Sequence, residues 1–271
     1  MRCLLRGTLA LGVAASPLGC RPPAQTQVHT LEVSAPAAPG SPAPGPAEIL
    51  SAHFAIDEAP PLGGDDALPV VFSAEIDAAS VVPQAFLVAL EDGSRARPRQ
   101  ALLAPASEDD ENRTVLLVGE FGGPLDNPPR NVAVVGALYT EDGRSLRYTA
   151  AEVLAFDVPP VVVYAEAREP RAGRCEGAGI VVRTYWQEGL RGVDRDDLDA
   201  VTVERRGGGE ARPFAFDDHA LDSQEREDNV LDLCLRGEQP PLRLRVQPGA
   251  FTDPAGHASA AVDIDVGEPP A

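Results

Sequence analysis

The 271-residue chain contains no lysine, so arginine supplies all 23 of its basic side chains. Aromatic residues make up only 5% of the sequence, and histidine and cysteine occur four times each. There is no H-x-x-x-H or C-x-x-C spacing, so we expect no structural or catalytic zinc. A G-x-S-x-G motif is also missing, and the histidines show no partner pattern of a hydrolase. We therefore expect a protein that is not an enzyme, with an exported hydrolase as a remote alternative.

Basic charge is scarce relative to acidic charge, since 42 Asp and Glu residues give a net charge of −19. Such a surface repels nucleic acid and anionic lipid headgroups, so we expect no nucleic-acid partner. One acidic segment, residues 194–199, offers Asp194, Asp196, Asp197 and Asp199 as oxygen ligands for calcium. It lacks the glycine turn and the distal glutamate of an EF-hand loop, and a solvated acidic loop is the more typical explanation. Calcium is the only cofactor that the sequence suggests.

Long hydrophobic runs are missing, and the one short run lies near the start of the chain. Residues 7–15 are weakly apolar and follow Arg2 and Arg6. The run is too short to span a bilayer as a mature helix but has the length of a signal-peptide core. Residues 1–19 are therefore predicted to be a signal peptide, and the protein to be exported.

The end of this segment, Leu18-Gly19-Cys20, resembles the signal of bacterial lipoproteins. The resemblance implies that Cys20 becomes the acylated first residue, carrying palmitate-type chains into a membrane of the bacterial cell envelope. The outer membrane is the expected site, on its periplasmic or its surface face. Pro17 stands where that family usually has an aliphatic residue, so an ordinary cleaved secretion signal is the alternative.

Residues 20–47 follow as a proline-rich linker with almost no large apolar side chains. Such a segment cannot bury enough surface to offset the entropy of ordering it. We predict a disordered tether that reaches at most about 80 Å in a polyproline-like conformation.

The rest of the chain consists of two similar halves. Residues 68–98 parallel residues 179–213, and the segments 109–124 and 130–145 recur in the same order at 226–240 and 244–258. Gly136 and Gly249 are 113 residues apart, as are Gly143 and Gly256. Each half holds short alternating runs rich in Val, Leu and Phe, separated by turns such as "EDG". This pattern predicts a tandem all-β protein with antiparallel sandwiches at 48–158 and 159–271.

The segment "VVFSAEIDAASVVPQAFLVALEDG" resembles the bacterial Ig-like domain of S-layer and other surface proteins. The residues that carry the resemblance include Phe72, Ser73, Asp77, Ser80 and Phe86, and Asp142-Gly143 and Asp253-Gly256 match a late turn. The resemblance implies two Ig-like domains in a surface setting and supplies no active site.

Of the cysteines beyond the signal peptide, Cys175 and Cys234 both lie in the second half. In an oxidising compartment we expect them to form a disulfide, which leaves Cys20 for the lipid. Tyr185 and Trp186 suit a sugar-stacking platform by composition, although a lone tryptophan on a strand is more typical of a core.

Together these features predict a cell-envelope lipoprotein that presents two Ig-like domains in a structural, adhesive or accessory role. Its expected partners are the membrane, through the lipid, and an envelope protein or polysaccharide. The alternative is a surface module that binds carbohydrate or calcium.

Overall fold

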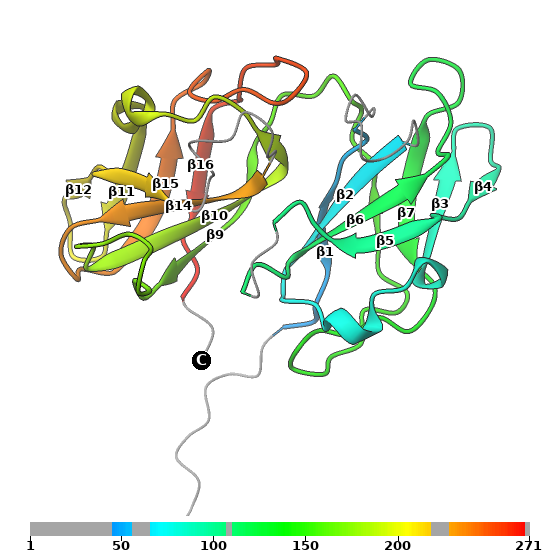
Figure 1. Ribbon diagram of the computed structural model, residues 1–271, viewed down its shortest axis with the longest axis horizontal. Coiled ribbons are helices and arrows are strands. Elements are labelled where there is room, and N and C mark those ends of the chain that lie inside the picture. The colour runs from blue at the N-terminus through cyan, green and yellow to red at the C-terminus, as the bar shows by residue number, and fades with distance from the viewer. Residues whose placement is uncertain (1–44, 56–65, 107–109, 218–227, 269–271) are drawn as a thin grey trace, which may run out of the picture. The chain divides into compact units, whose positions relative to one another are not determined.

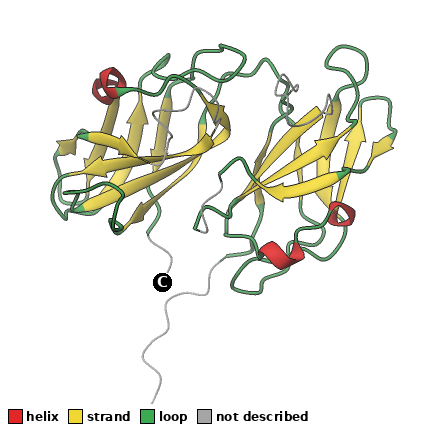
Figure 2. Ribbon diagram, in the orientation of Figure 1, coloured by secondary structure: helices red, strands yellow, loops and turns green. Residues whose placement is uncertain are grey.

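The computed structural model describes residues 45–55, 66–106, 110–217 and 228–268, and these residues form an all-β protein (Figure 1). The signal peptide, Cys20 and nearly all of the linker lie outside the described residues. No helix among the described residues is long and apolar enough to cross a membrane. The only helical elements there are short 3-10 turns, drawn in red in Figure 2.

The N-terminal sandwich consists of two four-stranded antiparallel sheets. The first sheet has the order β1 (Ile49–Ala52), β2 (Asp66–Phe72), β6 (Thr114–Gly119), β5 (Gln100–Leu103). The second has the order β4 (Arg95–Ala96), β3 (Phe86–Leu90), β7 (Pro129–Val134), β8 (Ala150–Glu152). Two 3-10 turns, η2 (Ala78–Ser80) and η3 (Pro83–Ala85), connect β2 to β3.

The C-terminal sandwich repeats this order strand for strand. Its first sheet has the order β9 (Val162–Arg168), β10 (Ile180–Leu190), β14 (Asp228–Leu235), β13 (Ala215–Asp217). Its second has the order β12 (Glu210–Ala211), β11 (Val201–Arg205), β15 (Pro241–Val246), β16 (Val262–Asp265). One 3-10 turn, η4 (Arg195–Ala200), lies between β10 and β11. Each strand of the second half thus has its counterpart eight strands earlier, as expected for a duplicated unit.

Alternation along the strands builds each core between its two sheets. In β2, Leu68, Val70 and Phe72 point into the N-terminal core, where they meet side chains of β3, β6 and β7. In β10, Val182 and Trp186 point into the C-terminal core in the same way. Because side chains of a strand alternate between the faces of its sheet, the residues between these lie on the outer faces. The alternating pattern therefore forms sandwiches of antiparallel sheets, which confirms the predicted fold class.

Both late turns predicted from the sequence are also formed. Gly143 has φ +83° and Gly256 has φ +90°, a left-handed conformation that favours glycine. Isolated bridges close the two turns at matching places, between Tyr139 and Ser145 and between Thr252 and Ala258.

Candidate functional site

A cluster of buried charge lies where the outer face of the β1-β2-β6-β5 sheet contacts the outer face of the β9-β10-β14-β13 sheet. We call this contact the seam. At its centre Val71, Ala106, Tyr185 and Val230 form a buried apolar cluster. The rings of Tyr185 and its neighbour Tyr164 lie 6.0 Å apart. These outer-face side chains are therefore covered by the other sandwich and not by solvent.

Arg113 immediately precedes β6, and its side chain crosses the seam. Its Nη2 donates to Oε2 of Glu166 on β9 over 2.9 Å, and their side chains are only 5% and 0% exposed. The guanidinium also stacks over Tyr164 and Tyr185, at 4.6 and 5.6 Å from the ring centroids. Burial alone would lower the pKa of Arg113, but the charge of Glu166 raises it above its ordinary value.

Glu166 joins this pair to a second arginine. Arg168 Nε donates to Glu166 Oε1 over 2.8 Å, and its Nη2 donates to Glu75 of the N-terminal sandwich. Glu166 is thus held between two guanidinium groups, one from each sandwich. Losing this carboxylate would leave buried positive charge without compensation.

A second charged group surrounds Arg183 of β10. Its Nε and Nη2 donate to the two carboxylate oxygens of Asp232 on β14, each over 2.8 Å. Its Nη1 donates to Asp110 of the N-terminal sandwich over 2.7 Å. Burial opposes the charge on Arg183, but the hydrogen bonds and charge of Asp232 raise its pKa. A bidentate pair of this kind fixes the orientation of the side chain as well as its charge.

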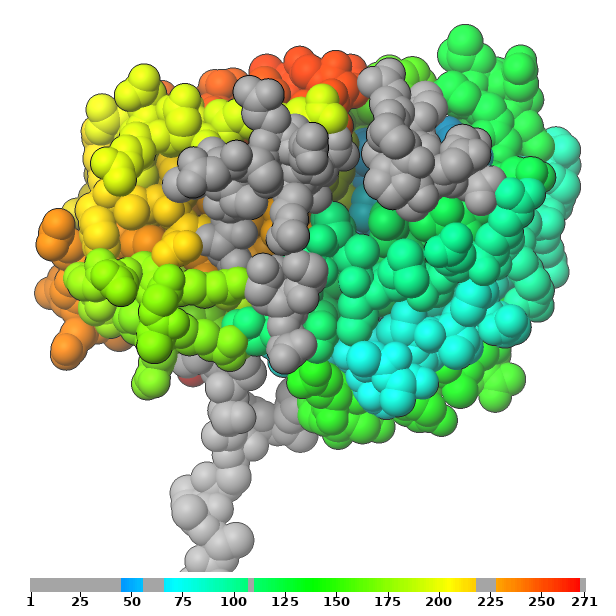
Figure 3. Space-filling model, in the orientation of Figure 1, coloured from blue at the N-terminus to red at the C-terminus, as the bar shows by residue number. Residues whose placement is uncertain are grey.

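The loop between β9 and β10 adds two more arginines to the same group. Arg171 pairs with Asp110 over 2.7 Å, and Arg174 pairs with Glu111 over 2.8 Å. In Figure 3 this loop, in yellow-green, forms part of the surface of the C-terminal sandwich. The loop therefore contributes charge to the edge of the seam while its other face meets solvent.

Uncharged and titratable groups complete the contact. His53, which follows β1, places Nε2 at 3.2 Å from Oε2 of Glu188 on β10. Asn229 of β14 donates to Oγ1 of Thr114 over 2.8 Å. Both contacts join opposite sandwiches, so polar bonds extend the seam beyond its apolar centre.

This arrangement is suited to holding two sheets in one relative orientation. Buried ion pairs add little net stability, because desolvation offsets much of their attraction, but they penalise every arrangement that leaves one partner alone. The apolar centre supplies attraction, and the charged groups select one register. Each carboxylate named here is paired with an arginine or a histidine.

The predicted disulfide is present. Cys175 and Cys234 are bonded, and both side chains are buried. The bond ties the β9–β10 loop to β14, and Asp217 of β13 accepts a hydrogen bond from the Cys175 backbone N–H. Asp217 also lies close enough to both sulfurs to resemble a metal-binding group, but sulfurs joined to each other are not thiolate ligands.

Three of the four aspartates proposed for calcium, Asp194, Asp197 and Asp199, have local structural roles. Asp194 caps η4 by accepting from the Asp196 N–H over 2.7 Å, and Asp197 accepts from the Asp194 N–H over 3.0 Å. Asp199 forms an ion pair with Arg212. Asp77 caps η2 at the matching place of the first half. Calcium binding at this segment stays a prediction.

Trp186 belongs to the core of the C-terminal sandwich and is not part of a sugar-stacking platform. It is 1% exposed, meets Phe251 edge-on at 5.3 Å and donates from Nε1 to Thr184. Tyr185 is fully buried in the seam. Neither ring presents a face on which a sugar stacks.

Sequence reasoning missed the seam itself. Its arginines and acids occupy alternate strand positions, which is also the pattern of a solvated outer face. The available signal was β10 and β14, "IVVRTYWQEGL" and "DNVLDLCL", where Tyr185, Val181 and Val230 put apolar side chains on the outer face as well.

No protein-family model and no curated protein matches the chain. Among solved structures, the S-layer protein rSbsC(31-844) matches at 14% identity with a TM-score of 0.31, over 82% of this chain and 26% of that one. The N-terminal part of the bacterial S-layer protein SbsC matches at 12% identity with a TM-score of 0.30, over 82% of this chain and 44% of that one. The chain thus spans less than half the length of either protein. At these TM-scores the likeness carries no conclusion about function.

Proposed function

We propose that this chain is a non-enzymatic structural module of the bacterial cell envelope, in which two Ig-like sandwiches act as one rigid spacer. The observation that carries the proposal is the seam, with buried charge pairs that lock two duplicated units in one orientation. A freely jointed pair of domains needs no such contact, because domain interfaces within a chain are ordinarily polar and permit motion. A spacer that sets a distance or direction does need it.

The segment between the sandwiches supports the same role. Leu154 N–H donates to Ala52 O over 2.8 Å, which ties the segment to β1. Farther along, Pro159 O accepts from the Gln187 side chain over 3.0 Å, and Pro160 O accepts from the Ala260 N–H over 3.0 Å. The connection is therefore bonded to both sandwiches along its length, which opposes hinge motion.

Rigidity of this kind has a direct thermodynamic test. In a calorimetric scan of the full chain we expect one cooperative transition, because neither sandwich keeps its seam face covered once the other unfolds. A variant lacking the seam's central rings, Tyr164→Ala/Tyr185→Ala, is expected to separate the scan into two transitions. Two transitions in the unaltered chain would contradict a single spacer.

The anchor belongs to the same proposal. Acylation of Cys20 would attach the spacer to the envelope, and residues 21–47 would hold it away from the membrane. Metabolic labelling with a clickable fatty acid tests this, with incorporation expected for the natural chain and lost in Cys20→Ala. Unlabelled protein released into the medium would contradict the anchor and would leave the spacer role to be judged by calorimetry.

A further inference from the structure

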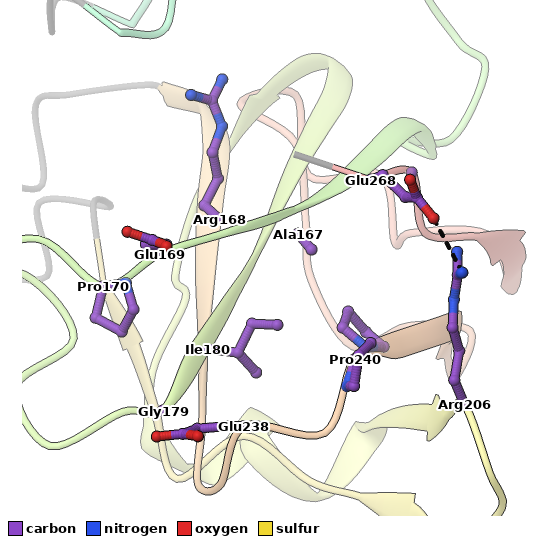
Figure 4. Close-up of a pocket in the computed structure, with 12 residues that line it drawn as sticks. Ala167, Arg168, Glu169, Pro170, Gly179, Ile180, Arg206, Glu238, Pro240 and Glu268 are labelled. Atoms are coloured by element: carbon purple, nitrogen blue, oxygen red, sulfur yellow. Dashed lines mark ion pairs between the residues drawn. The ribbon is translucent and has the colours of Figure 1, made fainter. Parts of the chain in front are cut away.

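A groove of about 580 Å³ opens at one end of the C-terminal sandwich, away from the residues that form the seam's apolar centre (Figure 4). It lies between the two sheets, with the end of β9 and the start of β10 on one side and the residues leading into β15 on the other. Its apolar lining residues include Ile180, Pro170, Pro240 and Pro241. Its size is within the range of ordinary binding pockets.

The positive charges of the groove are already engaged. Arg206 pairs with Glu268 over 3.0 Å, the contact marked in Figure 4. Arg168 pairs with Glu75 and Glu166 of the seam. Neither guanidinium is therefore available to hold an anionic ligand without giving up a carboxylate.

Two carboxylates of the groove are different. Glu169 and Glu238 have no hydrogen bond or ion pair with any other described residue, and both are exposed. In the view of Figure 4 they lie on one side of Ile180, opposite the Arg206–Glu268 pair. The groove thus combines an apolar floor with unpaired negative charge on one margin.

This combination excludes several kinds of occupant. An anionic ligand would meet two carboxylates in a chain of net charge −19. No aromatic side chain lines the groove, so a sugar ring has nothing to stack on. A purely apolar ligand would gain nothing from the two exposed carboxylates. A lysine or arginine side chain fits, because its aliphatic stem covers apolar surface while its charged end reaches a carboxylate.

We propose that this groove docks an extended segment of a partner protein that carries a basic residue beside proline or aliphatic residues. The apolar neighbours of the basic residue pack on Pro170, Ile180 and Pro240. The negative charge of Glu169 and Glu238 on the margin attracts the cation. The inference rests on the proposed spacer role only in assuming that this protein contacts another protein of the envelope.

Peptide selection against the full chain tests the groove without assuming a partner. The probe is a phage-displayed library of random heptapeptides, and the enriched peptides are then measured by fluorescence polarisation. We expect them to share a lysine or arginine next to proline or an aliphatic residue. Their affinity should fall as salt is raised, because exposed charge pairs are screened.

Two variants of equal net charge give the decisive comparison. Glu169→Gln/Glu238→Gln should weaken the enriched peptides about fivefold or more, as expected for the loss of two exposed charge pairs. Glu48→Gln/Glu152→Gln removes two exposed carboxylates of the N-terminal sandwich and should leave affinity unchanged. Equal affinity for both variants, enrichment of peptides without a basic residue, or no enrichment at all would overturn the proposal. None of these results affects the calorimetric test of the spacer.

Discussion

Glu166 is the single side chain on which the charges of the seam depend most. It is fully buried and lies between Arg113 and Arg168, which come from different sandwiches. A carboxylate in this position compensates one buried cation, Arg113, and one partly buried cation, Arg168. The energetic cost of changing it should therefore be that of an uncompensated buried charge and not that of one hydrogen bond.

For Glu166→Gln we predict a loss of about 3 kcal/mol in the free energy of unfolding, because an arginine is left buried without its counter-charge. Urea unfolding followed by Trp186 fluorescence measures this. Glu120→Gln removes the partner of Arg99 in an exposed pair and should cost less than about 1 kcal/mol. The apolar replacement Arg113→Met/Glu166→Met should recover most of the loss. Equal effects of the two single substitutions would contradict the compensating role of Glu166.

Asp110 makes the stability of the seam depend on pH. Burial raises the pKa of Asp110. The charges of Arg183, Arg171 and Arg174 lower it by more, so the pKa lies below its ordinary value of 3.8. A carboxyl with a lowered folded-state pKa contributes stability above pH 3.8, and that stability is lost as pH falls through the folded-state value.

We therefore predict that the free energy of unfolding decreases as pH falls below about 4 and that Asp110→Asn makes this decrease shallower. Thermal unfolding of both proteins between pH 2 and pH 6 measures the difference. An unchanged slope in Asp110→Asn would show that Asp110 is not held ionised by the arginines.

At the scale of strands and loops, the sequence predicted what local patterning determines. Alternating apolar positions placed β2, β3, β6 and their counterparts, because an amphipathic strand has one face to bury. Gly143 and Gly256 marked turns that require a left-handed residue. The partner of each outer face could not be predicted in the same way. Arg183 and Asp232 alternate with apolar residues along their strands, and this pattern is the same for a face that meets water and for one that meets another sheet. Asp110 comes into contact with Arg183 only in the folded chain.

The loop between β9 and β10 depends on the disulfide for its position. Cys175 lies one residue after Arg174, so the bond to Cys234 also fixes the arginines that reach Asp110 and Glu111. The bond closes a loop of 59 residues in sequence. By the chain-entropy model such a closure contributes about 4 kcal/mol to stability.

For Cys175→Ala/Cys234→Ala we predict a loss of up to about 4 kcal/mol, together with faster amide exchange in residues 169–179 and at the N-terminal side of the seam. Hydrogen exchange read by mass spectrometry locates the change. Faster exchange confined to the loop would mean that its arginines do not help to hold the sandwiches together.

The turn η4 offers a comparison between capping and calcium binding. Asp194 caps η4 as Asp77 caps η2. Asp194→Ala and Asp77→Ala should each cost about 0.5–2 kcal/mol as lost caps, equally in EDTA and in millimolar calcium. A melting temperature that rises with calcium in the natural chain, and no longer rises in Asp194→Ala, would instead establish the calcium site.

At the scale of the whole molecule, the two halves form sandwiches of the same topology, and we propose that the seam makes them one body. The connecting residues are bonded on both sides, and the apolar centre around Tyr185 and Val71 covers faces that would otherwise be exposed. The sequence predicted the duplication but not the joint, since the contact depends on residues more than fifty positions apart, such as Arg113 and Glu166.

Backbone ¹⁵N relaxation tests this central claim most directly, because it reports the rotational tumbling of each sandwich separately. In the full chain we predict one common rotational correlation time for the amides of β1–β8 and of β9–β16, with the value of a body that includes both sandwiches. Two shorter correlation times, each that of a single sandwich, would contradict the rigid spacer.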